Sequence, residues 1–322
     1  MSESGKIRDL LNLAGFLSLA AMIPSAAAGY MPSHVVVLIE ENHNLSDILG
    51  NSSAPYINSL SSSGALMTQS FNPPGLHPSQ PNYLWLFSGS NLGITSDAVF
   101  PADPPFTAPN LGAALIAAGD SFTGYSEGLP GVGFTGAASG LYARKHNPWV
   151  NWQSNSPGPN QLPASTNQPF SAFPTDYSTL PTVSFVIPNL CDDMQNACGG
   201  NSIANADTWL QANIDPFVQW AMNNNSLLIL TTDESHGGDL PVTTIFAGAG
   251  VIPGHYSEHV THSNILRTIE DFYGLVPTGD AVNALSLADS GIFNQASVPE
   301  PATFALLGLG LAGLGFSRRK QV

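Results

Sequence analysis

Basic residues are scarce in this chain. Its 322 residues include 8 Lys and Arg but 23 Asp and Glu, and five of the basic residues lie close to the two ends. The region 29–296 keeps three basic residues against 20 acidic ones, a formal charge of about −17. Such a surface repels nucleic acid and anionic lipid headgroups, which excludes nucleic acid as a partner. An anionic ligand would need a local cation here, and a bound divalent metal ion is the obvious candidate.

Cysteine is also scarce. The only two are Cys191 and Cys198, seven residues apart. Two thiols without a nearby histidine do not make a cysteine-based metal site, and in an oxidising compartment we expect them to form one disulfide that closes a short loop. The chain also lacks an internal repeat. The roughly 270 residues between its two ends are enough for one domain with an ample core.

The first 28 residues have the order of a secretory signal peptide. Lys6 and Arg8 precede an apolar stretch (10–23), and the small residues SAAA (25–28) follow. This order predicts export, with cleavage at the end of the alanine run. The alternative is a buried N-terminal helix, which Pro24 and the alanines disfavour.

Residues 298–322 form a second targeting segment. They contain VPEP (298–301), an apolar run of 15 residues (302–316) and the basic SRRK (317–320). The run is short for a membrane-spanning helix, which needs about 20 residues, although tilt or flanking residues extend it. The segment resembles the PEP-CTERM sorting signal of Gram-negative bacteria. That resemblance implies a short transmembrane helix, a basic cytoplasmic tail, and cleavage by an exosortase that releases the protein to the envelope or the outside. An ordinary C-terminal membrane anchor is the alternative.

Short apolar runs alternate with segments of helical spacing in the region between the ends. Strands are predicted at 33–39, 121–125, 183–187, 226–232 and 242–248. Helices are predicted at 82–88, 111–118, 206–223 and 263–273, and the polar stretch 148–174 reads as loop. The alternation predicts an α/β fold with a mainly parallel sheet covered by helices on both faces. In such folds ligands lie beyond the carboxyl ends of the strands.

Acidic pairs follow two of the predicted strands. The first strand is followed by Glu40, Glu41 and Asn42, and the strand 226–232 is followed by Asp233 and Glu234. Two strands that deliver these oxygens to one sheet edge would form a cage for a hard cation. A solvated loop is the alternative for either pair alone.

Ser79 stands at the start of the predicted helix 82–88, in the sequence HPSQPNY. A serine at a helix N-cap lies among free N–H groups at the positive end of the helix dipole. An oxygen nucleophile is stabilised there, and a nearby metal ion would lower the pKa of the hydroxyl. The alternative is that Ser79 only caps the helix.

These stretches resemble the phosphoesterase family of bacterial and fungal acid phosphatases and phospholipases C, within the alkaline phosphatase-like superfamily. The resemblance implies a three-layer α/β/α domain over 29–297 and covers most of it, in the family's order. The motifs are VVVLIEENHNLSDILG (35–50), HPSQPNYLWLFSGS (77–90), YARKHNPW (142–149), SFVIPNLCDDM (184–194), LLILTTDES (227–235) and THSNILRTIEDFYGL (261–275).

The resemblance also implies roles for individual residues. It makes Ser79 the nucleophile, and it implies a divalent metal ion, of unspecified identity, held by Glu41, Asn42, Ser79, Asp233 and Glu234.

The same resemblance implies contacts with the substrate phosphate. The residues concerned are His77, Arg144, His146 and Asp193. His262 matches a further motif histidine, for which the alternative is a residue of the N-cap region of the following helix.

The chain departs from the family at one position. Related sequences usually carry histidine after Asp193-Met194, and here the residue is Gln195. Glutamine donates hydrogen bonds but does not transfer a proton at ordinary pH. In the family that histidine would contact the phosphate or protonate the leaving group. The alternatives are that glutamine slows catalysis, that the acid role passes to His146, His236 or His262, or that activity is lost.

The sequence therefore predicts an exported, metal-dependent phosphoesterase that acts through a phosphoserine, acid phosphatase-like more than phospholipase C-like. Its expected partners are a phosphate ester, signal peptidase and exosortase. It would contact the membrane only through the C-terminal segment before processing. The alternative is a non-catalytic surface or exopolysaccharide-associated protein on the same scaffold. A sulfatase is disfavoured because no arginine lies near Ser79.

Overall fold

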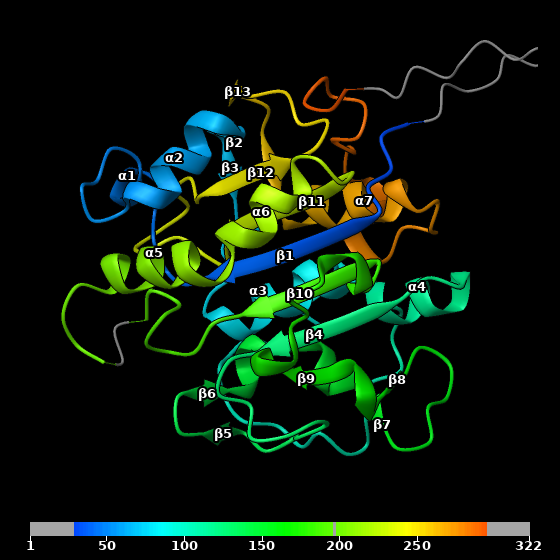
Figure 1. The fold of residues 1–322 in the computed structure, drawn as a ribbon. Helices are drawn as coiled ribbons and strands as arrows, with labels where there is room; N and C mark the ends of the chain where they lie inside the picture. The colour runs from blue at the N-terminus through cyan, green and yellow to red at the C-terminus, as the bar shows by residue number, and fades with distance from the viewer. Residues whose placement is uncertain (1–28, 196–197, 295–322) are drawn as a thin grey trace, which may run out of the picture.

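The first apolar run becomes the central strand of the sheet. The computed structural model describes residues 29–195 and 198–294, and in it β1 (His34–Glu40) lies between β10 (Val183–Ile187) and β11 (Ser226–Thr232) (Figure 1). Both neighbours are parallel to β1. All three strands are almost wholly buried, which is why their sequences are continuous apolar runs rather than alternating ones.

The sheet has eight strands in the order β13-β2-β12-β11-β1-β10-β4-β9. Only β12 runs against its neighbours, so the sheet is mainly parallel, as predicted. The outer strands are β2 (Ala65–Met67), β4 (Phe122–Ser126), β9 (Asn167–Pro169), β12 (Thr244–Gly248) and β13 (Gly254–Tyr256). Three small pairs lie outside the sheet: β3 (Ser70–Phe71) with β14 (Val260–Thr261), β5 (Ala138–Ser139) with β6 (Tyr142–Ala143), and β7 (Gln153–Ser154) with β8 (Leu162–Pro163).

Helices cover both faces of the sheet (Figure 1). Alternate residues of β1 belong to two separate hydrophobic cores, one on each face of the sheet. Val35 and Val37 pack with α3 (Ser79–Ser88), α4 (Leu111–Ala118) and α7 (His262–Phe272). Val36 and Leu38 pack with α2 (Pro55–Ser63), α5 (Ser202–Asn213) and α6 (Asp215–Ala221). Each fully buried side chain of this kind contributes about 1.5–3 kcal/mol. The predicted α/β architecture with a helical layer on each face is confirmed.

The remaining helices are short. They are α1 (Leu45–Ile48) and the 3-10 turns η1 (Arg144–His146), η2 (Pro148–Trp152), η3 (Ala164–Thr166), η4 (Phe170–Ala172), η5 (Tyr177–Thr179) and η6 (Gly279–Asn283).

Two predictions of local structure were wrong. The predicted helix 206–223 is two helices, α5 and α6, because Pro216 lies at the start of the second and cannot continue the first. The predicted loop 148–174 contains η2, η3, η4 and the edge strand β9, which extends the sheet beside β4.

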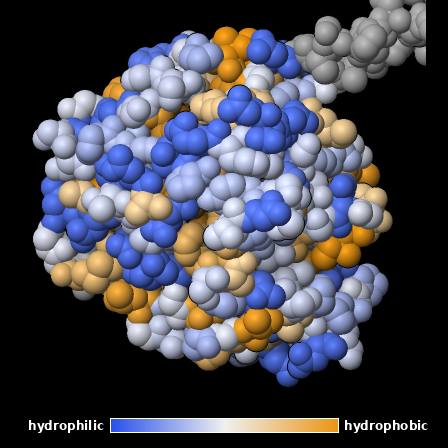
Figure 2. All heavy atoms as spheres, viewed as in Figure 1, coloured by the Kyte–Doolittle hydropathy of each residue, from blue (hydrophilic) through white to orange (hydrophobic). Residues whose placement is uncertain are grey.

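The surface mixes polar and apolar residues. In the view of Figure 2 hydrophilic residues cover most of the molecule and hydrophobic ones gather in small groups. Within residues 29–195 and 198–294, no helix is both long and apolar enough to span a membrane. The predicted signal peptide (1–28) and the short transmembrane helix of the C-terminal segment (298–322) lie outside the described residues.

Candidate active site

The two predicted acidic pairs meet at one edge of the sheet. Glu40 of β1 lies opposite Thr232 of β11, so Glu41 and Asp233 leave neighbouring strands at the same level. The Asp233 backbone N–H donates to the Glu40 carbonyl at 2.9 Å, and the Asn42 N–H donates to Asp233 Oδ1 at 3.0 Å. Parallel pairing of β1 with β11 therefore places both pairs at the carboxyl edge, where ligands bind in such folds.

Ser79 is the first residue of α3 and faces these carboxylates. Its Oγ donates to Glu41 Oε2 at 3.0 Å and lies 3.3 Å from Glu234 Oε1. The N-cap of α3 is Pro78, so the expectation that Ser79 caps the helix was wrong. The Ser79 side chain is buried, at 2% exposure, and is held by residues from β1 and β11 rather than by its own helix.

Two amides converge with Ser79 on the same carboxylate oxygen. Glu41 Oε2 accepts from Gln195 Nε2 at 2.6 Å and from Asn42 Nδ2 at 3.1 Å. Gln195, the residue that replaces the family's histidine, thus lies inside the site and binds its central acid. The loop that carries Gln195 is closed by a disulfide between Cys191 and Cys198, whose Cα atoms are 5.1 Å apart.

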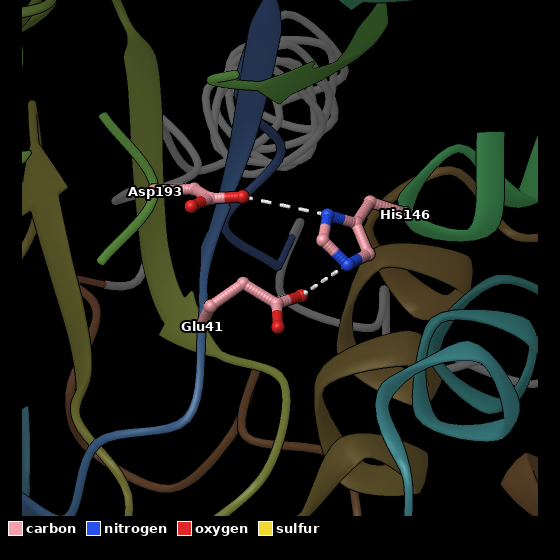
Figure 3. A group of neighbouring side chains, drawn as sticks. All are labelled: Glu41, His146 and Asp193. Atoms are coloured by element: carbon pink, nitrogen blue, oxygen red, sulfur yellow. Dashed lines mark ion pairs between the residues drawn. The ribbon is translucent and has the colours of Figure 1, made fainter. Parts of the chain in front are cut away.

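His146 lies between two buried carboxylates (Figure 3). Its Nε2 is 3.0 Å from Glu41 Oε1, and its Nδ1 is 3.4 Å from Asp193 Oδ2. Its ring stacks on Tyr83, whose hydroxyl donates to Glu41 Oε1 at 2.6 Å. Burial raises the pKa of Asp193 to about 6, while the contact with His146 opposes this shift. One atom each of Glu41, His146 and Asp193 lies within 4.8 Å of the other two, so this buried group could hold a metal ion.

Glu234 is paired with a histidine. Its Oε2 contacts His77 Nδ1 and lies 3.4 Å from Asn82 Nδ2. Burial raises the pKa of Glu234, and the contact with His77 lowers it. His77 therefore faces a predicted metal ligand, while its own side chain remains 38% exposed.

Asp233 is a buried acid whose side chain is only partly hydrogen-bonded. Its Oδ2 is buried without a hydrogen-bond partner. Burial raises the pKa of this carboxyl well above its usual range, and the charges of Glu41 and Glu234 raise it further. His262 lies against the same residue, with its Nε2 2.5 Å from the Asp233 carbonyl oxygen.

The other predicted residues have distinct surroundings. His262 is fully buried and burial lowers its pKa to about 4, which suits a residue that positions Asp233 rather than one that protonates a substrate. The Arg144 guanidinium donates to the backbone carbonyls of Thr135 and Phe100. These contacts do not support its predicted contact with the substrate phosphate. His236, by contrast, is exposed.

A pocket of about 800 Å³ lies beside the site. Asn42 and Gln195 line it, and so does His236. The same two amides donate to Glu41 Oε2, which also accepts from Ser79, so they connect the pocket lining with the buried serine through one carboxylate.

Sequence reasoning missed the role of Tyr83. It lies four residues after Ser79 on α3, a spacing that places both side chains on one face of a helix. That spacing was the available signal. Tyr83 belongs to the apolar run of the predicted helix 82–88, and the run by itself does not indicate a site residue.

The C-terminal segment and the body match two separate families. Residues 50–276 match the Phosphoesterase family, and residues 297–320 match the PEP-CTERM protein-sorting motif. This motif indicates export to the cell envelope in Gram-negative bacteria and implies processing by an exosortase.

Individual relatives agree with the family match. The chain is 46% identical over 268 residues to a phosphatidylinositol-3-phosphatase of Mycobacterium tuberculosis, covering 82% of this chain and 85% of that protein. It is 28% identical over 287 residues to an acid phosphatase of Aspergillus fumigatus, covering 80% of this chain and 61% of the fungal protein.

The fold also has a counterpart among solved structures. A protein in the alkaline phosphatase superfamily from Vibrio parahaemolyticus superposes with a TM-score of 0.55 at 12% identity, over 81% of this chain and 72% of that one. This likeness shows the shared α/β fold. The match over residues 50–276 and the relative of 46% identity show that the chain belongs to the phosphoesterase family, whose enzymes hydrolyse phosphate esters.

Proposed function

We propose that this protein is an exported phosphomonoesterase that uses Ser79 as its nucleophile and a divalent metal ion as its cofactor. The observation that carries the proposal is the position of the Ser79 hydroxyl, buried between the Glu41 and Glu234 carboxylates. If Ser79 only began the helix, its side chain would not need to lie between two acids that follow two different strands.

The donor set fits a divalent cation. Ser79 shares the site with buried carboxylates, and the imidazoles of His77 and His146 lie in close contact with them. The unpartnered Asp233 Oδ2 is costly without a positive neighbour. Oxygen donors of this kind suit a hard or borderline divalent ion. We propose that the ion is held by Glu41, Asn42, Ser79, Asp233 and Glu234.

The group of Glu41, His146 and Asp193 offers a second arrangement. It shares Glu41 with the first and adds an imidazole nitrogen. Both arrangements agree on the chemistry that the cation supplies when bound: it lowers the pKa of a coordinated hydroxyl and neutralises charge on a phosphoryl group. They differ in the acid that is required to bind the ion: Asp233 in the first arrangement and Asp193 in the second. Substitution of each acid therefore distinguishes the two arrangements.

The proposed reaction has two displacements. Ser79 Oγ gives its proton to one of the two carboxylates beside it, Glu41 or Glu234, and forms a bond to phosphorus as the bond from phosphorus to the ester oxygen breaks, and the departing alcohol takes a proton. Water then attacks the phosphoserine, the bond from phosphorus to Oγ breaks, Oγ regains a proton from the attacking water, and phosphate leaves. Positioning and charge neutralisation supply most of such a rate enhancement.

His236 is the proposed donor of the proton to the alcohol. It lines the pocket together with Asn42 and Gln195 and is exposed, so it can exchange its proton with water. His146 is held between two carboxylates and His262 against a backbone carbonyl, so neither faces the pocket. Gln195 binds Glu41 and does not transfer a proton.

The relatives support a monoesterase. Both are named as phosphatases, which favours the acid phosphatase-like branch over a phospholipase C. The formal charge of about −17 on region 29–296 disfavours docking on an anionic lipid surface. Phosphomonoesters are therefore the proposed substrates.

The test is p-nitrophenyl phosphate hydrolysis by the region 29–296 with and without EDTA. We expect turnover that EDTA abolishes and a divalent ion restores, and a loss of at least about a thousandfold in Ser79→Ala. Ser88→Ala is the matched control, because Ser88 lies on the same helix and binds backbone carbonyls of its own segment. Full activity of Ser79→Ala, or turnover indifferent to EDTA, would contradict the proposal. A folded protein inactive with every divalent ion would instead favour the non-catalytic surface role.

A further inference from the structure

Lysine and arginine are scarce in the described part of the chain, residues 29–195 and 198–294, which holds Arg144, Lys145 and Arg267. The Arg144 guanidinium donates to two backbone carbonyls. Arg267 pairs with Asp271 of its own helix at 2.9 Å. Lys145 is the remaining cation, so it is the side chain to consider for the recognition of an anionic substrate.

The Lys145 ammonium is held next to the start of α3. Its Nζ is 2.5 Å from Asp97 Oδ2, and the other oxygen of Asp97, Oδ1, accepts from the Gln80 backbone N–H at 2.9 Å. The Gln80 side chain fixes the same loop, because its Nε2 donates to the Ser96 carbonyl at 2.8 Å. Gln80 directly follows Ser79, the proposed nucleophile. One carboxylate therefore joins the ammonium to the residue next to the nucleophile.

A second connection runs through the residue that follows Lys145. Lys145 and His146 are consecutive in η1, and His146 Nε2 lies 3.0 Å from Glu41 Oε1. The other oxygen of Glu41 accepts from the Ser79 hydroxyl. Lys145 is thus connected to the surroundings of Ser79 from two sides, through Asp97 and through His146.

The ammonium also lies within electrostatic reach of the acids of the site. Burial lowers the pKa of Lys145, but its hydrogen bond to Asp97 and the charges of nearby acids, Glu41 first among them, outweigh burial and raise the pKa. Asp233 contributes to this rise as well. The side chain therefore carries a positive charge at the edge of the sheet where the acids gather.

Lys145 has hydrogen-bond donors to spare. An ammonium group has three donors, and within the described residues Asp97 is its hydrogen-bond partner. The Lys145 side chain is 27% exposed, so a ligand can reach it. An ion pair between partly exposed side chains contributes little stability, so a phosphate competes with Asp97 at small cost.

We propose that the Lys145 ammonium, held by Asp97 at the start of α3, binds the phosphate group of the substrate beside Ser79. The proposal rests on the proposed function and names the protein cation that recognises the substrate in so acidic a body. A lysine acts on phosphate as a point charge with several donors. Lys145 thereby takes the role that the sequence suggested for its neighbour Arg144.

The test measures p-nitrophenyl phosphate hydrolysis and its competitive inhibition by inorganic phosphate, at a saturating concentration of divalent ion. Lys145→Met keeps the length of the side chain and removes its charge. We expect this variant to raise the KM for p-nitrophenyl phosphate and the inhibition constant of inorganic phosphate together, each about ten- to a hundredfold, while kcat changes less. Lys145→Arg keeps the charge and should raise both constants far less than Lys145→Met does.

Arg267→Met is the matched control. Arg267 pairs with an aspartate as Lys145 does, and both basic side chains are 27% exposed. The substitution changes the net charge by the same amount and should leave KM and the inhibition constant unchanged. An equal rise of these constants in Arg267→Met and Lys145→Met would show an effect of net charge alone and would overturn the proposal.

Two other results in Lys145→Met would also overturn it. A lower kcat with an unchanged inhibition constant would show that Lys145 supports the start of α3 without binding phosphate. Unchanged constants, with less divalent ion needed for half-maximal activity, would show that Lys145 only offsets the negative charge of the site. Failure of the unmodified protein to hydrolyse p-nitrophenyl phosphate would instead overturn the proposed function.

Discussion

At the scale of single residues, the site is organised around one carboxylate oxygen. Glu41 Oε2 accepts from Ser79, Asn42 and Gln195, which come from three separate segments. Because one acid gathers the nucleophile and two pocket-lining amides, a change at any of them alters the position of the others. This coupling explains how glutamine can occupy the position of the family's histidine and still take part in the site.

His236 gives a prediction that depends on the leaving group. If it protonates the departing alcohol, His236→Gln should lower kcat for glucose 6-phosphate about a hundredfold, because an alkoxide is a poor leaving group without a proton. Hydrolysis of p-nitrophenyl phosphate should fall by far less, since p-nitrophenolate leaves unprotonated.

His255→Gln is the matched control for this prediction, because His255 is exposed on β13, away from the pocket lining. An equal loss of kcat on both substrates would show that His236 does not act as the acid.

The residue types of the site could be predicted, but not their orientations. Glu41, Asn42, Asp233 and Glu234 were recognisable because they directly follow apolar strands. The contacts of Arg144 were not, because the carbonyls that it binds belong to other segments of the chain. Tertiary packing determines which group a side chain contacts, and the neighbouring residues in the sequence do not predict that contact.

At the scale of elements, the interior strands are the ones that the sequence specifies best. The bounds of β10 and β11 agree with the predicted runs because both faces of these strands are buried. The edge strand β13 and its neighbour β2 were not predicted. They have three residues each, too few to show a period; β13 pairs with β2, and β2 pairs also with β12.

Helix α7 contains a buried acid that predicts a pH effect. Glu270 is fully buried, its Oε1 accepts from the N–H and hydroxyl of Thr278, and burial raises its pKa to about 7. Since the folded state holds this proton more tightly than the unfolded state, stability is lost as pH rises through about 4.5 to 7. Glu270→Gln keeps an acceptor for Thr278 and removes the charge.

The measurement is the free energy of unfolding in urea at about pH 5 and about pH 8. Glu270→Gln should gain roughly 1–3 kcal/mol relative to the unmodified protein between these two values. Glu258→Gln, at an exposed position, should show no such gain. A constant difference between Glu270→Gln and the unmodified protein would show that Glu270 is ionised in the folded state throughout.

At the scale of the whole molecule, net charge and metal binding are linked. The acidic body repels itself, and the site concentrates four buried carboxylates at one edge of the sheet: Glu41, Asp193, Asp233 and Glu234. A ligand that binds only the folded state stabilises it in proportion to the logarithm of its concentration. A divalent ion should therefore raise the melting temperature of the EDTA-treated protein by several degrees.

Substitutions locate the ion without measuring activity. Asp233→Asn should abolish the metal-induced shift if the ion lies among the five proposed ligands, whereas Asp193→Asn should reduce it less. The reverse order would assign the ion to the group of Glu41, His146 and Asp193. An equal shift in both variants and the unmodified protein would show that neither group binds the ion.

The central claim is that Ser79 becomes covalently phosphorylated, and peptide mass spectrometry after acid quenching tests it most directly. The protein is mixed with excess p-nitrophenyl phosphate and a divalent ion, quenched during turnover and digested. We predict one phosphoryl group on the peptide that contains Ser79, and none in Ser79→Ala. A phosphoryl group on another residue, or turnover without any on Ser79, would contradict the account.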